Sequence, residues 1–338
     1  MKKKLVAILQ YVLFLGLGLF LVWWSIQKIT PSDWVDINHA IKHARWWVLI
    51  PIIVCLLLSH YSRAIRWKIL MTPLGYRPSL RNTYLAVLIG YLANLAFPRL
   101  GEVLKCTTLA KYEKVPADKL VGTIVAERAF DVICLLLLIG ITFFTQVNVI
   151  GDYFETVLSE NFGEKAAFFR SWGILILLLT GAAGLLLLIW FLNKFQHIKF
   201  IGKIRAIGIN AWKGVTSIKY VKNKGWFIFH SLFIWLMYFL STYIGMQALK
   251  ETEHLGILPS MSALSIGSIA MIITPSGLGA YPAMIQETML LYQLESGIGL
   301  ALGWLMWSAQ IFQIAIAGFI ALILFPIFNK KKINETGE

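Results

Sequence analysis

Residues 298–328 read IGLALGWLMWSAQIFQIAIAGFIALILFPIF, and none of them is charged. A helix needs about 20 apolar residues to cross the hydrocarbon core of a bilayer, so this stretch is long enough. Further apolar runs occupy residues 5–26, 47–59, 132–144, 172–192 and 226–249. Hydrophobic residues make up 58% of the 338-residue chain and charged residues only 14%, too few for a soluble protein of this size. The sequence therefore predicts an all-α integral membrane protein.

The N-terminus resembles a signal peptide, because Lys2, Lys3 and Lys4 precede about twenty apolar residues. The apolar run is longer than the core of an ordinary signal peptide, and residues 25–28 offer no small-x-small cleavage site. We therefore expect the first apolar run to be retained as the first span.

Charge distribution predicts the orientation of the chain. Residues 61–81 and 193–225 hold Lys and Arg but no acid, whereas 146–170 and 250–256 are mixed or acidic. The positive-inside rule places the first two segments and the C-terminal tail in the cytoplasm, and the mixed segments outside. Both termini are then cytoplasmic, in a cell inner (plasma) membrane. The net charge of +14 is explained by loops that face anionic lipid, so no nucleic-acid partner is predicted.

The clear spans already connect the cytoplasmic segments in even numbers of membrane crossings. The two remaining segments, 83–112 and 257–294, must therefore each cross the membrane an even number of times, zero or two. Each contains a short apolar helix of about fifteen residues, a Pro/Gly break, and a second, more polar helix. Fifteen residues of helix reach only about 22 Å, which is short for a crossing. We interpret both segments as re-entrant helical hairpins. The alternative, two irregular helices packed for structural reasons, stays open.

The resulting prediction is about six full transmembrane helices plus two re-entrant hairpins, arranged as an inverted-topology repeat of the kind found in secondary transporters. The predicted parts are a first repeat at 1–145 with its hairpin at 83–112, an external loop at 146–170, and a second repeat at 171–328. The second repeat contains the cytoplasmic basic segment 193–225 and the hairpin 257–294, and a cytoplasmic tail follows at 329–338.

Charged residues follow the break in the first hairpin. Pro98 and Gly101 interrupt the helix, and Arg99, Glu102 and Lys105 recur every three residues, which predicts one shared helix face. Ionised groups at membrane depth should face a polar cavity. Arg99 beside a helix N-terminus suits an anionic group such as phosphate. Pairing of Arg99 with Glu102 in a solvated loop is the alternative.

A second charged group opens the span that follows. Glu127, Arg128 and Asp131 precede the apolar run that begins at Val132. Arg128 and Asp131 should share a face, and Glu127 should lie close to it. These residues predict either a ligand site or an ion-pair lock for the neighbouring hairpin, and the two are compatible.

The turn of the second hairpin is uncharged and contains Pro275, Gly277, Gly279 and Tyr281. Its glycines permit positive φ and close approach of the backbone, so its amides are candidates to bind an oxygen ligand. Arg63 and Arg66, expected just past the second span, either recruit lipid headgroups or anchor the interface, and anchoring is the simpler interpretation. Histidines and cysteines show no ligand spacing, so no catalytic residue, metal or cofactor is predicted.

Three ordered motifs carry a resemblance to a known family: Pro98-x-x-Gly101-Glu102, then Glu127-Arg128-x-x-Asp131, then the turn at 275–279. They resemble the lysylphosphatidylglycerol synthase transmembrane region, also called the flippase-like domain, which is the membrane half of the multiple peptide resistance factor. The chain is similar to a stand-alone member without the synthase domain. The resemblance implies re-entrant helices and movement of a lipid between leaflets. Tyr281 and Pro282 stand where many members have a Glu, which leaves an acid-dependent step there unsupported.

Together these features predict a lipid translocase that moves a membrane phospholipid or other phosphate-bearing lipid through a polar cavity between the hairpins. The alternative is an integral-membrane enzyme, or an accessory subunit, that acts on lipid-linked substrates. A homo-oligomer and a lipid-modifying enzyme partner both stay open.

Overall fold

The computed structural model describes residues 2–27, 29–97, 100–147, 149, 190, 194, 221 and 223–330. Within these ranges the chain forms helices and turns and no strand, which confirms the all-α prediction. Arg99, the predicted span at 171–192, most of the loops at 146–170 and 193–225, and most of the tail lie outside the described residues. The α-helices are α1 (Lys2–Gln27), α2 (Pro31–Lys42), α3 (Leu49–Met71), α4 (Leu80–Ala96), α5 (Leu100–Glu113), α6 (Ala117–Thr145), α10 (Lys224–Met246), α11 (Ile257–Ile273), α12 (Ala280–Leu290) and α13 (Ser296–Phe328).

Three of the described helical stretches are long and apolar enough to cross a membrane: Trp46–Leu74, Lys224–Met246 and Ser296–Phe328. The first consists of α3 with the short 3-10 turns η1 (Trp46–Val48) and η2 (Thr72–Leu74) at its ends. Leu15–Gln27 and Ile257–Ile273 are shorter apolar helices. Helix α6 has 29 residues but carries Glu127, Arg128 and Asp131 near its middle. These helices confirm a membrane protein.

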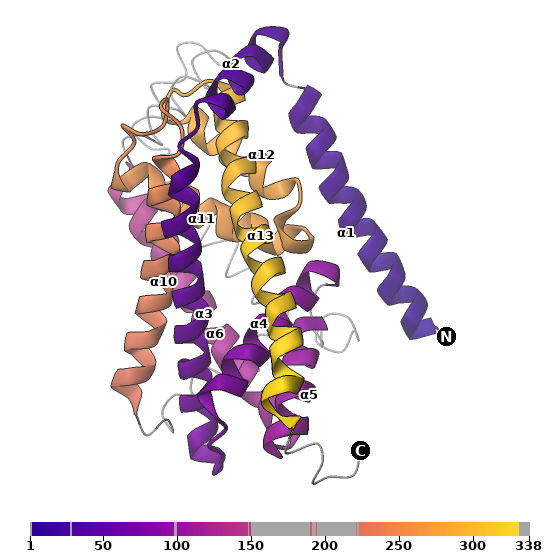
Figure 1. Cartoon of the computed structure of the whole chain (residues 1–338). Coiled ribbons are helices and arrows are strands. Elements are labelled where there is room, and N and C mark those ends of the chain that lie inside the picture. Colours follow the sequence, from indigo (N-terminus) through magenta and orange to yellow (C-terminus); the bar gives the residue numbers. More distant parts are fainter. Residues whose placement is uncertain are drawn as a thin grey trace.

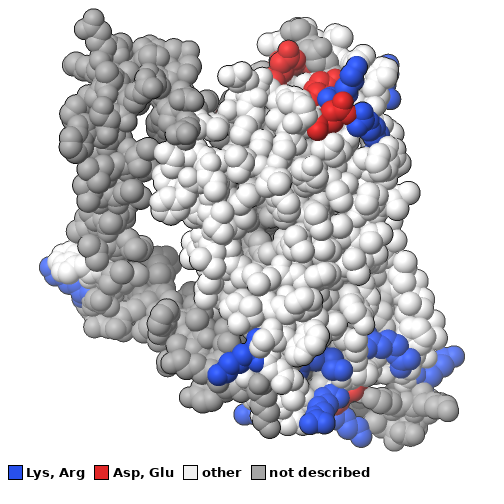
Figure 2. Space-filling model, turned by 90° about the vertical axis from the view of Figure 1, so that its left-hand side faces the viewer, with Lys and Arg blue, Asp and Glu red and all other residues white. Residues whose placement is uncertain are grey.

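The helices run between two ends of a bundle (Figure 1), and these two ends differ in charge (Figure 2). At one end the Asn82 amide donates to the Asn329 amide oxygen at 2.9 Å, which joins the start of α4 to the end of α13. We call this the basic end, and it carries Lys68, Arg77, Arg81, Lys111, Lys114, Lys119, Lys224 and Lys330 with Glu113 and Asp118. At the opposite, mixed end, Arg45 pairs with Glu253. Figure 2 shows mainly Lys and Arg along the lower edge and both signs of charge at the upper edge.

Helices α4 and α5 form a hairpin that starts and finishes at the basic end and turns in the middle of the bundle (Figure 1). Its arms touch where Gly90 faces Gly101, since a Cβ built on Gly101 would lie 2.0 Å from the Gly90 carbonyl oxygen. The Asn94 side chain accepts a hydrogen bond of 2.8 Å from the Gly101 backbone N–H and so satisfies a free donor at the start of α5. Close arms and a capped turn keep this hairpin compact.

Helices α11 and α12 form a second hairpin that enters from the mixed end, with the 3-10 turn η5 (Pro275–Gly277) at its tip (Figure 1). The tips of the two hairpins meet, because the Ser276 hydroxyl donates to the Asn94 backbone carbonyl at 3.3 Å. Helix α13 supports the contact from the side, since the Trp307 indole N–H donates to the Ser276 carbonyl at 2.8 Å. The middle of the bundle is therefore built from two helix breaks rather than from continuous helices.

Candidate functional site

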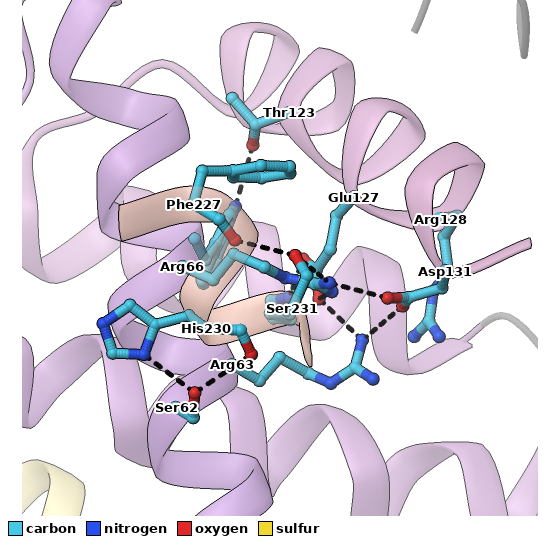
Figure 3. A network of polar contacts seen from close by, with 12 residues as sticks. Ser62, Arg63, Arg66, Thr123, Glu127, Arg128, Asp131, Phe227, His230 and Ser231 are labelled. Carbon is cyan, nitrogen blue, oxygen red and sulfur yellow. Dashed lines mark hydrogen bonds and ion pairs between the residues drawn. The ribbon is translucent and has the colours of Figure 1, made fainter. Parts of the chain in front are cut away.

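Four ionised side chains from α3 and α6 meet inside the bundle. Arg63 and Arg66 lie one turn apart on α3 and are 3% and 0% exposed. Arg63 Nη1 donates to Glu127 Oε1 at 2.8 Å and to Asp131 Oδ2 at 2.7 Å. Arg66 Nη1 lies 2.7 Å from Asp131 Oδ1, and Arg66 Nη2 lies 3.4 Å from Glu127 Oε1. Each arginine therefore contacts both carboxylates (Figure 3).

Lys105 brings a fifth charge from the second arm of the first hairpin. Its Nζ donates to Glu127 Oε2 at 3.0 Å and lies 4.0 Å from the centre of the Trp67 ring. The Trp67 indole N–H donates in turn to the Thr123 hydroxyl at 2.8 Å, which fixes the ring between α3 and α6. An ammonium group over an indole face gains a cation–π attraction that is strongest when water is excluded. The hairpin is thus tied to α6 and α3 through one buried lysine.

Helix α10 closes the other side of this charge cluster, which consists of Arg63, Arg66, Lys105, Glu127 and Asp131. The Ser231 hydroxyl accepts from Arg66 Nη1 at 3.1 Å, and the Tyr238 hydroxyl accepts from Arg63 Nη2 at 3.2 Å. Arg66 is five residues from the end of α3 and Glu127 ten from the start of α6, which places the cluster about 8–15 Å inside the basic end. Ionised groups at such depth in a membrane protein mark functional sites.

The charge cluster carries a positive excess. Its three cations face two carboxylates, so one positive charge is not balanced within it. Arg63 Nε and Arg66 Nε are also buried and have no hydrogen-bond acceptor among the described residues. A buried cation that is not paired is costly, and a buried donor without a partner adds to that cost. An oxyanion with several acceptor atoms would satisfy both the charge and the two donors.

Arg128 of α6 and Glu102 of α5 form a further, partly exposed pair next to the charge cluster. Arg128 Nη2 lies 3.5 Å from Glu102 Oε1, and their side chains are 45% and 30% exposed. Arg128 lies beside Asp131 (Figure 3), but its ion pair is with Glu102, whereas Asp131 pairs with Arg63 and Arg66. A common role for Arg128 and Asp131 stays a prediction. Glu102 and Lys105, one turn apart on α5, have different partners: Lys105 is buried against Glu127, and the partly exposed Glu102 pairs with Arg128.

The four residues selected in the second hairpin turn lie at its tip, outside the charge cluster. Gly277 and Gly279 have φ of 72° and 70°, which side chains rarely adopt. A Cβ on Gly279 would lie 2.1 Å from the Gly18 carbonyl oxygen, so α1 packs directly on the turn. Pro275 is buried in the turn, and Tyr281 is buried against Gly267 of the opposite arm. These residues shape the turn and close its two arms.

The placement of Arg63 and Arg66 just past the second span is wrong. Helix α3 continues to Met71, and both arginines lie within it with their side chains turned into the bundle. A positive charge near the end of an apolar run normally indicates an interface. Here the carboxylates of α6 stabilise the two guanidinium groups inside the protein instead. Their predicted part in recruiting headgroups stays a prediction.

Several residues around the charge cluster were not selected from the sequence. Tyr91 of α4 lies under Arg63, with 5.8 Å between the guanidinium carbon and the ring centre. Asn94, one turn further along α4, contacts the second hairpin through Ser276. Ser231 and Tyr238 belong to an apolar run in which a hydroxyl group is not unusual. The signal that would have found Asn94 is its position before a Pro/Gly break, where an amide side chain caps the next helix.

Helices long enough to span a bilayer, together with ionised groups buried between them, define an integral membrane protein with a charge site inside it. The family model described as the lysylphosphatidylglycerol synthase TM region matches residues 8–318, so the chain belongs to this family, and the resemblance drawn from its motifs is confirmed. The chain is similar to the UPF0104 membrane protein MJ1595 of Methanocaldococcus jannaschii, with 27% identity over 312 residues that cover 85% of this chain and 87% of the relative. No solved structure matches the chain significantly.

Proposed function

We propose that this protein is a lipid translocase, a flippase-like transporter that moves a phosphate-bearing lipid between the leaflets of the membrane. The observation that carries the proposal is the positive excess of the buried charge cluster, with its two unpartnered guanidinium N–H groups. A phosphodiester headgroup supplies one negative charge and several acceptor oxygens, which match this excess. The acyl chains would remain in hydrocarbon while the headgroup passes through the bundle.

The arrangement of the hairpins supports a transport path. Each hairpin begins and finishes at one end, the two enter from opposite ends, and their tips touch at Ser276 and Asn94. We propose that in a membrane these are two re-entrant hairpins between about six full spans, related as an inverted repeat. Broken helices that meet at mid-depth form the binding sites of many transporters, and backbone there must line protein or a water-filled cavity. Separation of the two tips would connect the charge cluster with the mixed end of the bundle.

The proposed orientation places the basic end in the cytoplasm of the cell and the mixed end outside. The described lysines and arginines at the basic end support this orientation through the positive-inside rule. Headgroups from the cytoplasmic leaflet would then need to travel only about 8–15 Å to reach the charge cluster. Arg128, whose side chain is 45% exposed beside Glu102, would receive an anionic headgroup before it reaches the charge cluster.

The experiment reconstitutes the full chain in liposomes and follows fluorescent phosphatidylglycerol between leaflets. The decisive variant is Lys105→Met, because it removes the charge excess and leaves two arginines facing two carboxylates. The matched control is Lys111→Met, an exposed lysine on the same helix. We expect at least a tenfold loss of rate in Lys105→Met, with an unchanged gel-filtration profile, and the wild-type rate in Lys111→Met. Equal rates in both variants, or a wild-type rate equal to that of empty liposomes, would contradict the proposal.

A further inference from the structure

His60 is a buried imidazole one turn before Arg63 on α3, with 3% of its surface exposed. Its Nε2 lies 3.2 Å from the Gln313 side-chain oxygen of α13, and its ring centre lies 4.3 Å from that of Tyr91 of α4. With the proton on Nε2, that nitrogen donates to Gln313 and Nδ1 keeps a free lone pair. Nδ1 has no hydrogen-bond partner among the described residues. The Nδ1 lone pair is therefore unused inside the bundle.

The carboxylates of the charge cluster are poorly suited to carry a proton. Glu127 contacts Arg63, Arg66 and Lys105, and Asp131 contacts both arginines. Positive neighbours at these distances favour the ionised form of a carboxyl group. Glu102 lies outside the charge cluster and pairs with Arg128. His60 differs from these groups because its contacts on α4 and α13 are neutral side chains.

The charges that face His60 determine when it accepts a proton. On its own helix the nearest is Arg63, whose positive charge opposes a second one on the imidazole. From α4 it faces Tyr91 and from α13 the uncharged Gln313, while Tyr238 of α10 and the carboxylates of α6 contact Arg63 rather than His60. An anion bound at the charge cluster would offset the positive field at Arg63. Bound anion and bound proton would then stabilise each other, and this coupling is reciprocal.

We propose that His60 is a proton-binding site coupled to the anion site, so that the protein takes up one proton with each anionic headgroup and releases both together. The proton comes from water and binds Nδ1, which converts neutral imidazole to imidazolium, and no other bond changes. This inference rests on the proposed function and adds its energy source, because co-transport of a proton lets a pH gradient drive the lipid from the more acidic side of the membrane to the less acidic side. It also assigns the substrate class, a headgroup with a net negative charge.

The test measures proton uptake on binding to the full chain in detergent. Short-chain phosphatidylglycerol is titrated calorimetrically in two buffers of different ionisation enthalpy, which yields the number of protons taken up per lipid. A phosphodiester does not titrate near neutral pH, so any uptake belongs to the protein. We expect a pH range in which uptake approaches one proton per lipid and affinity rises close to tenfold for each unit of decreasing pH. In His60→Gln and His60→Asn, uptake should vanish and affinity should become independent of pH.

The matched control is His230→Gln. His230 is a second buried imidazole, but its Nδ1 is 2.8 Å from the Ser62 hydroxyl and so already has a partner. This variant should keep the wild-type uptake. Uptake that persists in both His60 variants would overturn the inference while the proposed function stands. Wild-type protein that binds no phosphatidylglycerol, or that binds deacylated glycerophosphoglycerol equally well, would instead overturn the proposed function, since the ligand would then not be a lipid.

Discussion

The Ser276 hydroxyl donates to the Asn94 backbone carbonyl at 3.3 Å, although 182 residues separate the two in sequence. Each residue stands at a helix break, so the contact joins two turns rather than two helix faces. Ser276 has a φ of 53°, in the left-handed region that few side chains adopt. Its carbonyl is held by the Trp307 indole N–H at 2.8 Å. The tip of the second hairpin is therefore held from two sides, by Asn94 of α4 and by Trp307 of α13.

The glycine at position 279 should be needed for stability. In Gly279→Ala the new Cβ would lie 2.1 Å from the Gly18 carbonyl oxygen, at a φ of 70° that alanine disfavours. We expect a destabilisation of about 1–3 kcal/mol, seen as a lower melting temperature in detergent. Gly16→Ala on α1 is the control, because nothing lies within 4 Å of a Cβ there. Equal melting temperatures for the two variants would show that α1 does not pack on this turn.

Removal of the Glu127 charge should destabilise the fold strongly. Glu127→Gln leaves three buried cations facing only Asp131, and loss of one partner from a buried ion pair costs roughly 3–5 kcal/mol. The double variant with Lys105→Met removes one of the unpaired cations. The decrease in its free energy of unfolding should be smaller than the sum of the decreases in the two single variants by about 1–3 kcal/mol. Denaturant unfolding of the four proteins measures this interaction energy, and strict additivity would mean that Lys105 and Glu127 do not interact.

The helices and their breaks could be predicted from the sequence, because apolar runs and Pro/Gly breaks are local signals. Glu127 and Asp131 could also be selected, since carboxylates beside an apolar run are unusual. The side of α6 on which these two carboxylates lie could not be predicted. On a helix Asp131 is about 40° from Glu127 and about 60° from Arg128, so a shared face with either one fits the spacing.

The partners of those carboxylates could not be predicted from local patterns. Arg63 and Arg66 stand near the end of an apolar run, where the same two residues would serve equally well as interfacial anchors. Only the packing of α3 against α6 and α10 turns their side chains inward, and their contacts there join residues 61 or more positions apart. The contact between the hairpin tips also joins residues far apart in the sequence, so the pattern of apolar residues does not predict it.

Thiol labelling tests whether the two ends of the bundle lie on opposite sides of the membrane. Each of two variants carries one exposed cysteine in a background with Cys55, Cys106 and Cys134 replaced by alanine: Lys114→Cys at the basic end and Lys250→Cys at the mixed end. A maleimide that does not cross membranes should label Lys250→Cys in intact cells. Lys114→Cys should react only after permeabilisation. The opposite pattern would reverse the orientation, and labelling of both in intact cells would rule out a crossing between them.

Joining the hairpin tips covalently should stop transport. In the same cysteine-free background, Asn94→Cys with Ser276→Cys places two thiols at turns that touch in this structure. A short bismaleimide should link them, and translocation of fluorescent phosphatidylglycerol should fall at least tenfold, because the tips can no longer separate. Each single variant treated with the reagent should keep most of its activity, which controls for modification alone.

A second cross-linked pair tests whether any cross-link stops transport or only one that joins the hairpin tips. Arg45→Cys with Glu253→Cys replaces the ion pair at the mixed end, where the cross-link joins the start of α3 to the segment before α11 and leaves the tips free. This protein should transport at close to the rate of its uncross-linked form. If the tip cross-link forms fully and transport continues unchanged, lipid does not pass between the hairpins, and the path would have to lie along α6 near Arg128.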